Sequence, residues 1–523
     1  MSMKCLNEKI HSKYKFSSLS VALLRLSRMA VQLFILGIMP VLAFAQYKTG
    51  LLPSPKEKVE NLVKYISPVS SLPSTVDNSA GCPPVGDQGN QGSCASWAIG
   101  YYYKSYQEAK DQNWSLTTAN HQFSPAFLYN QINGGTDSGS TLYDNINILV
   151  NKGCASLRLM PYDDTDLTTW PTAATSQSAL PYRAKDMAFF FITNGIGDNV
   201  IDAMKQHLNN GDIFVLAIPV YENFFDSNNT FYAGCNYFYN EVSGKLAGGH
   251  AVTIVGYDDN VSSCAAGGCS VKGGFKMRNS WGTAWGNSGE IYLSYEFVKK
   301  YAWEAVYMTD RIGYSPTATA EIKIEHPFRN EIGVTLAGGG WSQTVYNNSG
   351  GSVPDIHTIV DISDGPSPAL TEWSLLVENN YDISCATVSL FTITYNSVVY
   401  PCPDVPCVIS NSGKSVLHVS AGLQSPQNKV KNFPNPFYPS NISRVTIRMP
   451  ERYWGSRMKV LIYNMAGVPV RTLEESTGDA NPGIGTAYWD GKNSSGDMVA
   501  SGLYYYVVDT GGKKFRGNIT LIK

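Results

Sequence analysis

Cys94 is the residue of this 523-residue chain best suited to nucleophilic chemistry. It follows the glycine-rich segment 84–93, and residues 94–102 after it predict a helix with an apolar face. A thiol at a helix N-terminus lies at the positive end of the helix dipole, which lowers its pKa and favours the thiolate. Gln88, six residues earlier, carries an amide that can donate to an oxyanion. This segment alone equally allows a buried or disulfide-bonded cysteine after a glycine-rich loop.

Two segments far downstream supply the partners that such a thiol needs. His250 stands near the start of residues 248–257, an alternating, β-branched run that predicts a strand with an imidazole at its mouth. Asn279 begins the sequence Asn-Ser-Trp-Gly, shortly before the strand-like residues 290–293. An imidazole with a pKa of about 6.5 can pair with a thiolate and then protonate a leaving amine. An asparagine oxygen can accept from its other ring nitrogen and fix its orientation.

Two other histidines compete weakly for this role. His121 lies in a loop that leads into a predicted helix, and we expect it to be structural or exposed. His207 lies in a polar predicted helix, and we expect it to be solvated. Neither is followed by an Asn-Ser-Trp-Gly segment at a comparable distance, so His250 is the better candidate.

The order glutamine, cysteine, histidine, Asn-Ser-Trp-Gly resembles that of papain-like cysteine peptidases, over about Leu72 to Asp310. The resemblance implies an α+β fold whose catalytic domain has two lobes, one helical and one β-barrel-like. It also implies Cys94 as nucleophile, His250 as base and acid, Asn279 as orienting residue and Gln88 as oxyanion donor, with neither metal nor cofactor.

The same resemblance suggests how substrate binds. Trp281 is expected to lie over the His–Asn pair and screen it from water, although a core tryptophan fits the sequence equally well. A glycine pair that binds the substrate backbone is Gly134 and Gly135, or else the neighbourhood of Gly139. The pocket for the residue next upstream of the scissile one is expected to be roomy and apolar, because the residues implied for it are small: Ala217, Gly249 and Ala251.

The chain also departs from the family pattern. Ala95 replaces the aromatic residue that usually follows the nucleophile, and Gln91 replaces a common cysteine, so that disulfide cannot form. His250 and Asn279 are 29 residues apart because residues 258–273 insert a loop. These departures suggest a bacterial branch of the family.

The N-terminus predicts export. The apolar run 29–45 ends in Ala-x-Ala and follows basic residues, which indicates a signal peptide over residues 1–45; a membrane anchor is the alternative. Residues 46–71 then form a short leader or propeptide. It is too short to resemble the long inhibitory propeptides of many papain-like enzymes, so the means of keeping the enzyme inactive stays open.

Cysteine usage agrees with export. Of the ten cysteines, Cys264 and Cys269 form the best local disulfide candidate, closing the inserted loop. A zinc site at this pair is a weak alternative, because no second Cys/His pair lies near it.

Two all-β sandwich domains are expected after the peptidase domain, which we bound at residues 72–312. Residues 313–424 resemble the jelly-roll accessory domain of proprotein-convertase-type proteases, or form a generic spacer, with His326 and His357 structural rather than metal ligands. Residues 425–523 resemble the immunoglobulin-like C-terminal sorting domains of the type IX secretion system, related to the flagellar-hook-cap fold. A passive sandwich for surface contact is the alternative.

Composition limits the partners. A net charge of −2 and a pI of about 6.4 provide no basic field for nucleic acid. We therefore expect a cysteine endopeptidase, secreted or held at the outer-membrane surface, whose partners are protein or peptide substrates and the secretion machinery. No transmembrane anchor is expected after signal cleavage. The alternatives are a catalytically weak surface adhesin or binding module, and an acyl transferase using the same site.

Overall fold

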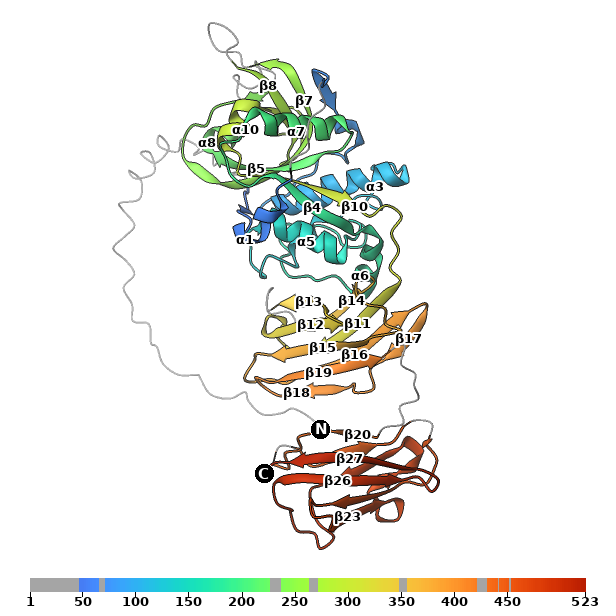
Figure 1. Ribbon diagram of the computed structural model, residues 1–523. Helices are drawn as coiled ribbons and strands as arrows, with labels where there is room; N and C mark the ends of the chain where they lie inside the picture. Colours follow the sequence, from blue (N-terminus) through green and yellow to red (C-terminus); the bar gives the residue numbers. More distant parts are fainter. Residues whose placement is uncertain are drawn as a thin grey trace, which may run out of the picture. The chain divides into compact units, whose positions relative to one another are not determined.

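The computed structural model describes residues 47–523 apart from 65–70, 226–236, 263–270, 348–354, 421–429, 441 and 451–452 (Figure 1). Residues 1–48 and 49–523 are separate units. The predicted signal peptide and the predicted Cys264–Cys269 pair lie outside the described residues.

Most of the helices precede residue 310. They are α1 Lys56–Val59, α2 Cys94–Ser96, a π-helical continuation Trp97–Lys104, α3 Ser105–Gln112, α4 Pro125–Tyr129, α5 Leu142–Lys152, α6 Ala173–Ala179, α7 Asp198–Asn209, α8 Glu222–Phe225 and α10 Tyr295–Tyr301. Short 3-10 helices occur at Glu60–Leu62, Ser79–Gly81, Leu180–Tyr182, Arg329–Glu331, Glu475–Thr477 and Pro482–Ile484.

The helix that begins at Cys94 is buried on all sides along residues 94–104, rather than on a single apolar face. Its polar groups are paired inside the protein: Ser96 Oγ donates to Asn145 on α5, and Lys104 forms ion pairs with other buried groups. Gly100 permits the close approach of α4, because a Cβ there would lie 2.9 Å from a methyl carbon of Leu128. The nucleophile segment is therefore a central helix of the domain.

A ten-stranded sheet packs against these helices (Figure 1). Its strands are β1 Leu51–Leu52, β2 Thr75–Asp77, β3 Ser140–Thr141, β4 Ala184–Phe191, β5 Phe214–Tyr221, β6 Phe238–Tyr239, β7 Leu246–Ser262, β8 Lys272–Arg278, β9 Glu290–Ser294 and β10 Glu304–Asp310. The main order is β4-β10-β5-β7-β8-β9-β6. Strand β7 pairs antiparallel with both β5 and β8, so His250 on β7 and the residue that follows β8 lie on neighbouring strands.

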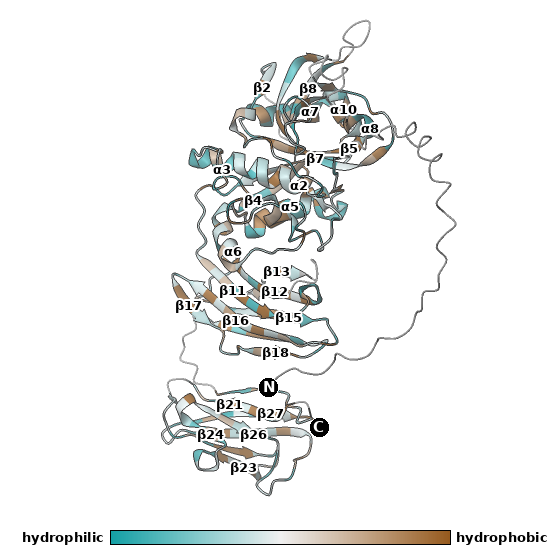
Figure 2. Ribbon diagram, turned by 180° about the vertical axis from the view of Figure 1, so that it is seen from behind, coloured by the Kyte–Doolittle hydropathy of each residue, from teal (hydrophilic) through white to brown (hydrophobic). Residues whose placement is uncertain are grey.

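Two further pairs of sheets follow. Residues 318–420 form one sheet of five strands and one of four, made of β11 Ala318–Glu325, β12 Ile332–Gly338, β13 Trp341–Asn347, β14 Ile356–Asp361, β15 Glu372–Asn379, β16 Ala386–Tyr395, β17 Val398–Pro401, β18 Cys407–Ile409 and β19 Lys414–Ser420. We call this part the middle domain. Buried and partly exposed residues alternate along β11 and β12, as expected for sheets with one face on a core, and Figure 2 shows hydrophobic and hydrophilic residues mixed along these strands.

The last part contains two four-stranded sheets around buried Phe437 and Trp489. Its strands are β20 Lys431–Phe433, β21 Val445–Arg448, β22 Lys459–Tyr463, β23 Pro469–Glu474, β24 Ala480–Asn481, β25 Thr486–Trp489, β26 Gly502–Asp509 and β27 Lys514–Leu521. Within the described residues, no helix has the length and hydropathy needed to cross a membrane.

Helix α4 starts as its sequence predicts. Ser124 is the N-cap, its hydroxyl accepting from Phe127 N at 3.2 Å, and Pro125 occupies the first helical position. The same hydroxyl donates to Met160 O at 2.6 Å. The buried Ser124 hydroxyl thus provides a hydrogen-bond partner both for a backbone N–H of the first helical turn and for a carbonyl of the neighbouring loop.

Ser124→Ala should lower the free energy of unfolding by about 1–3 kcal/mol, because it removes the cap and leaves a buried carbonyl without its donor. Thr172→Ala is the matched control, since Thr172 caps α6 in the same way but is exposed. Urea unfolding followed by tryptophan fluorescence measures both. An equal or smaller loss for Ser124→Ala would contradict the prediction.

Candidate active site

The thiol of Cys94 lies at the N-terminus of α2 and is fully buried. Burial raises its pKa to about 11, although backbone N–H groups of Ala251 and Gly50 contact the sulfur and act in the opposite direction. The pKa is therefore raised rather than lowered as the helix terminus predicts, because burial is the largest influence on this thiol. The thiol is neutral here.

His250 and Asn279 form a direct pair. His250 Nε2 lies 2.7 Å from Asn279 Oδ1, and both residues are fully buried. Because an amide oxygen can only accept, Nε2 carries the hydrogen and Nδ1 is the basic nitrogen. Burial lowers the pKa of His250 to about 4, which the bond to Asn279 partly opposes, so the ring is also neutral. The Trp281 ring covers the imidazole, with 4.4 Å between ring centroids.

Both the oxygen and the nitrogen of the Gln88 side-chain amide form hydrogen bonds. Its Oε1 accepts from Ser280 Oγ at 2.6 Å, and its Nε2 donates to Gln91 O at 2.8 Å. Its backbone N–H also donates to Ser280 O at 2.8 Å. Since Ser280 follows Asn279, these bonds attach the loop before Cys94 to the histidine–asparagine pair. The role of Gln88 as oxyanion donor stays a prediction.

Tyr102 is a further supporting residue that the motifs do not indicate. Its hydroxyl donates to Asn279 O at 2.7 Å and accepts from Gly86 N at 3.0 Å. It lies two turns after Cys94 on the buried helix, so the nucleophile helix directly supports Asn279. A tyrosine in an apolar run gives no sequence signal for this contact, because only the fold brings the two segments together.

The N-terminal segment crosses this site. Residues 49–54, which we call the leader strand, contain β1, which pairs parallel with β3 and antiparallel with β7. Gly50 N donates to Gly249 O at 3.2 Å, and Gly50 O accepts from Ser140 N at 3.0 Å. A Cβ on Gly50 would lie only 2.1 Å from Gly92 O. The leader strand therefore lies against the thiol and against the loop that precedes it.

The leader strand has two further attachments. Leu51 is buried in the cluster that includes the small residues Ala217 and Ala251, both predicted to line a substrate pocket. Ser54 donates through its N–H and its hydroxyl to the carboxylate of Glu304, both at 2.6 Å. Glu304 is buried on β10, and burial raises its pKa. A carboxylate at the start of a largely apolar strand is the sequence signal that marks this residue.

The two glycine candidates differ in position. Gly134 and Gly135 lie in a turn with positive φ, and Gly135 N bonds to Asn133 of the same turn. Gly139, with φ of 89°, lies against the leader strand, since a Cβ there would be 2.0 Å from Gly50 O. Gly139 and Ser140 thus supply the backbone edge that already binds a peptide. Substrate binding by Gly134 and Gly135 stays a prediction that this geometry does not favour.

The two competing histidines lie away from the site. His121 stacks on Trp114, with 4.5 Å between ring centroids. The expectation that His207 is solvated is wrong: it is buried, contacts Ile213 O at 3.0 Å and packs on Phe190. The helix α7 turns this residue toward the sheet, which a polar local sequence does not reveal.

The two histidines of the middle domain that are predicted to be structural have partners within that domain. His326 Nδ1 contacts Phe328 in its own turn, and His357 pairs with Glu321. Across the described part of the chain, no group of His, Cys, Asp or Glu side chains could hold a metal ion. The described cysteines are all free thiols: Cys82, Cys94, Cys154, Cys385, Cys402 and Cys407.

Iodoacetamide should alkylate Cys94 slowly at pH 7 in the protein with its leader strand intact. The rate should rise as the pH approaches 11, because only the thiolate reacts and burial raises this pKa. Peptide mapping by mass spectrometry measures the rate, with the exposed Cys385 as internal control. Fast labelling of Cys94 that is already constant above pH 5 would contradict this prediction.

Comparison with known proteins shows what this chain is similar to. The model of the papain family of cysteine proteases matches residues 72–308. An uncharacterized peptidase C1-like protein of Acanthamoeba polyphaga mimivirus is 26% identical over 219 residues, which are 40% of this chain and 64% of that relative's length. Among solved structures, xylellain of Xylella fastidiosa is 24% identical with a TM-score of 0.40, covering 50% of this chain and 96% of its own. Procathepsin B of Trypanosoma congolense is 19% identical with a TM-score of 0.36, covering 52% and 89%. Residues 72–308 of this chain therefore match the family of papain-like cysteine proteases.

Proposed function

We propose that this protein is a secreted cysteine endopeptidase with Cys94 as nucleophile, His250 as base and acid, and Asn279 as orienting residue. The observation that carries the proposal is the buried His250–Asn279 hydrogen bond under Trp281, which leaves Nδ1 as the basic nitrogen. An imidazole fixed in this tautomer beside a helix-terminal thiol can perform acyl transfer.

The reaction begins when substrate replaces the leader strand. The thiol proton of Cys94 moves to His250 Nδ1, and the thiolate attacks the peptide carbonyl. Gln88 and the backbone N–H of Cys94 donate to the oxyanion; losing such a donor costs about 10² to 10³ in turnover. The imidazolium then protonates the leaving amine, and water, deprotonated by the same ring, hydrolyses the acyl-enzyme and releases the acid.

The leader strand keeps this machinery latent. It occupies the hydrogen-bonded edge at Gly249 and Ser140, and it lies against the buried thiol. Activation then consists of removing residues 49–54 from the site. A leader of this kind can be short, because it blocks the nucleophile directly.

The substrate pocket accepts an aliphatic side chain of about the size of leucine. Leu51 of the leader strand supports this proposal, since it is buried beside Ala217 and Ala251, and its backbone pairs with Gly249. Glu304 adds an acidic hydrogen-bond acceptor at the end of the same region.

Export completes the proposal. The predicted signal peptide and the immunoglobulin-like sorting domain over residues 425–523 would take the enzyme to the outer-membrane surface or the medium through the secretion machinery. The two four-stranded sheets with a shared buried core support an immunoglobulin-like sandwich. The sheet pair over residues 318–420 supports a jelly-roll-like accessory domain.

Cys94→Ala should abolish casein cleavage under reducing conditions, with a loss of at least about 10³-fold, because no other group can form the acyl-enzyme. Cys154→Ala is the matched control, since Cys154 is equally buried and its thiol contacts Ser124 O. Counting released amines against new amide products separates hydrolysis from acyl transfer. A folded, leader-free protein that neither cleaves casein nor reacts at Cys94 would favour a binding module.

Gly50→Val should activate the full-length protein without any cut in the leader, because a side chain at this position collides with Gly92 O. Both casein cleavage and Cys94 alkylation at pH 7 should increase at least about tenfold. Leu52→Val is the control, since Leu52 is on the same strand but exposed. If Gly50→Val stays as latent as the unchanged protein, the leader strand is not the inhibitor.

A further inference from the structure

One irregular segment lies between the candidate active site and the middle domain. We call residues 161–172 the bridging loop and residues 88–93, which precede the nucleophile, the oxyanion loop. Neither contains regular secondary structure, so side-chain contacts determine where each of them lies. The bridging loop contacts the oxyanion loop on one side and strands of the middle domain on the other.

On the active-site side, Tyr162 makes the first link. Its hydroxyl donates to Gln88 O at 2.8 Å and lies 2.8 Å from Ser93 Oγ. Its ring packs edge-on against Trp97 of the nucleophile helix, with 4.9 Å between centroids. One side chain of the bridging loop therefore contacts both ends of the oxyanion loop.

Further bonds join the middle of the two loops. The buried Gln91 donates through Nε2 to Asp166 O at 3.1 Å and Asp163 O at 3.4 Å, and Asn90 N donates to a carboxylate oxygen of Asp164 at 2.7 Å. Gln91 stands where a disulfide cysteine is common in the family, so these bonds attach the loop in the absence of that bridge. A shift of the bridging loop must therefore move the oxyanion loop.

On the other side, Arg329 of the middle domain holds the bridging loop. Its guanidinium carbon lies 4.3 Å from the Trp170 ring centroid, and its NH2 group donates to Thr168 O at 3.1 Å. The Trp170 ring also packs edge-on against Tyr346 of β13, with 4.7 Å between centroids. Arg329 is fully buried, so this cation has exchanged water for the loop's ring and carbonyl.

We infer that the middle domain is part of the catalytic apparatus, with Arg329 and Trp170 as positioning residues that act on Gln88 through the bridging loop. This inference rests on the proposed role of Gln88 as oxyanion donor. The loop is also bonded to the end of α4, where Asn130 and Asn133 donate to Thr169 O and Leu167 O. Loss of Arg329 therefore displaces the loop without unfolding it.

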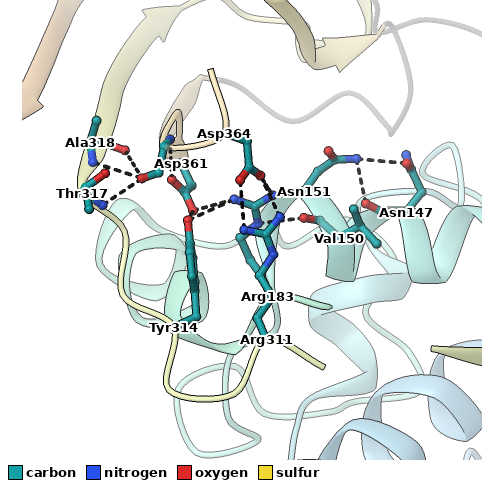
Figure 3. A network of polar contacts seen from close by, with 11 residues as sticks. Asn147, Val150, Asn151, Arg183, Arg311, Tyr314, Thr317, Ala318, Asp361 and Asp364 are labelled. Atoms are coloured by element: carbon teal, nitrogen blue, oxygen red, sulfur yellow. Dashed lines mark hydrogen bonds and ion pairs between the residues drawn. The ribbon is translucent and has the colours of Figure 1, made fainter. Parts of the chain in front are cut away.

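A second contact between the two domains provides a control. Arg183 donates to Asp361 and to Asp364, both at 2.6 Å, and Arg311 also donates to Asp364 (Figure 3). Tyr314 OH donates to Asp361 at 2.5 Å. These bonds join the middle domain to residues at the start of β4 and after β10, rather than to the bridging loop. A substitution of Asp361 therefore weakens the contact between the middle domain and the peptidase domain without changing the bridging loop.

The test compares Arg329→Ala with Asp361→Asn in the full chain, each with its leader displaced by Gly50→Val. Arg329→Ala should lower kcat about tenfold on a peptide amide with little change in KM, because Gln88 acts on the oxyanion and not on bound substrate. Asp361→Asn should lower Tm and leave kcat unchanged. Trp170→Leu removes the ring that Arg329 covers and should act like Arg329→Ala.

Two further measurements separate positioning from general stability. In a Gln88→Ala background, Arg329→Ala should have little additional effect on kcat, because both changes remove the same contribution. Amide hydrogen exchange of residues 88–94 should be faster in Arg329→Ala and unchanged in Asp361→Asn. Equal kcat losses for Arg329→Ala and Asp361→Asn, or a full tenfold loss without Gln88, would overturn the inference.

The exchange measurement does not depend on catalysis. If the protein with its leader displaced cleaves nothing, the proposed function fails while exchange at residues 88–94 still reports on the positioning. Unchanged exchange in Arg329→Ala and Trp170→Leu would overturn the inference even in an active enzyme.

Discussion

The hydrogen bond between His250 and Asn279 is the interaction on which the rest of the site depends. It exists because β7 and β8 are antiparallel neighbours. This pairing brings His250, near the start of β7, next to Asn279, which follows the end of β8. The ring covering the pair, the glutamine loop bonded to Ser280 and the tyrosine that supports Asn279 are all organised around it. A base of defined tautomer needs this enclosure, since water would otherwise compete for both nitrogens.

The same enclosure makes the resting state unreactive. Burial disfavours both the thiolate and the imidazolium, and the leader strand occupies the neighbouring backbone edge formed by Gly249 and Ser140. An ion pair at this site requires either water or a substrate dipole in place of the leader. Desolvation of the thiol and the imidazole thus agrees with the proposed latency of the site.

The middle domain contacts the peptidase domain through buried arginine side chains as well as through packed aromatic rings. Arg183 meets two carboxylates, whereas Arg329 meets a ring and a carbonyl of the bridging loop. Such contacts are geometrically specific, because a planar guanidinium must align with each partner. They therefore suit the positioning of a loop that lacks secondary structure of its own.

The sequence by itself predicted the candidate reacting residues and their order, because each chemical role admits few residue types and Asn-Ser-Trp-Gly is a distinctive neighbour. It also predicted the α4 cap, the strands around His250 and the β-rich character of residues 313–523, since local spacing and turn residues control these. Only the tertiary structure decided the burial of His207 and the support of Asn279 by Tyr102. It also decided that Gly50 and Leu51 occupy the site and that contacts of the bridging loop connect Arg329 with Gln88. These depend on contacts between segments far apart in the chain, and no local pattern encodes desolvation or the partner of a buried polar group.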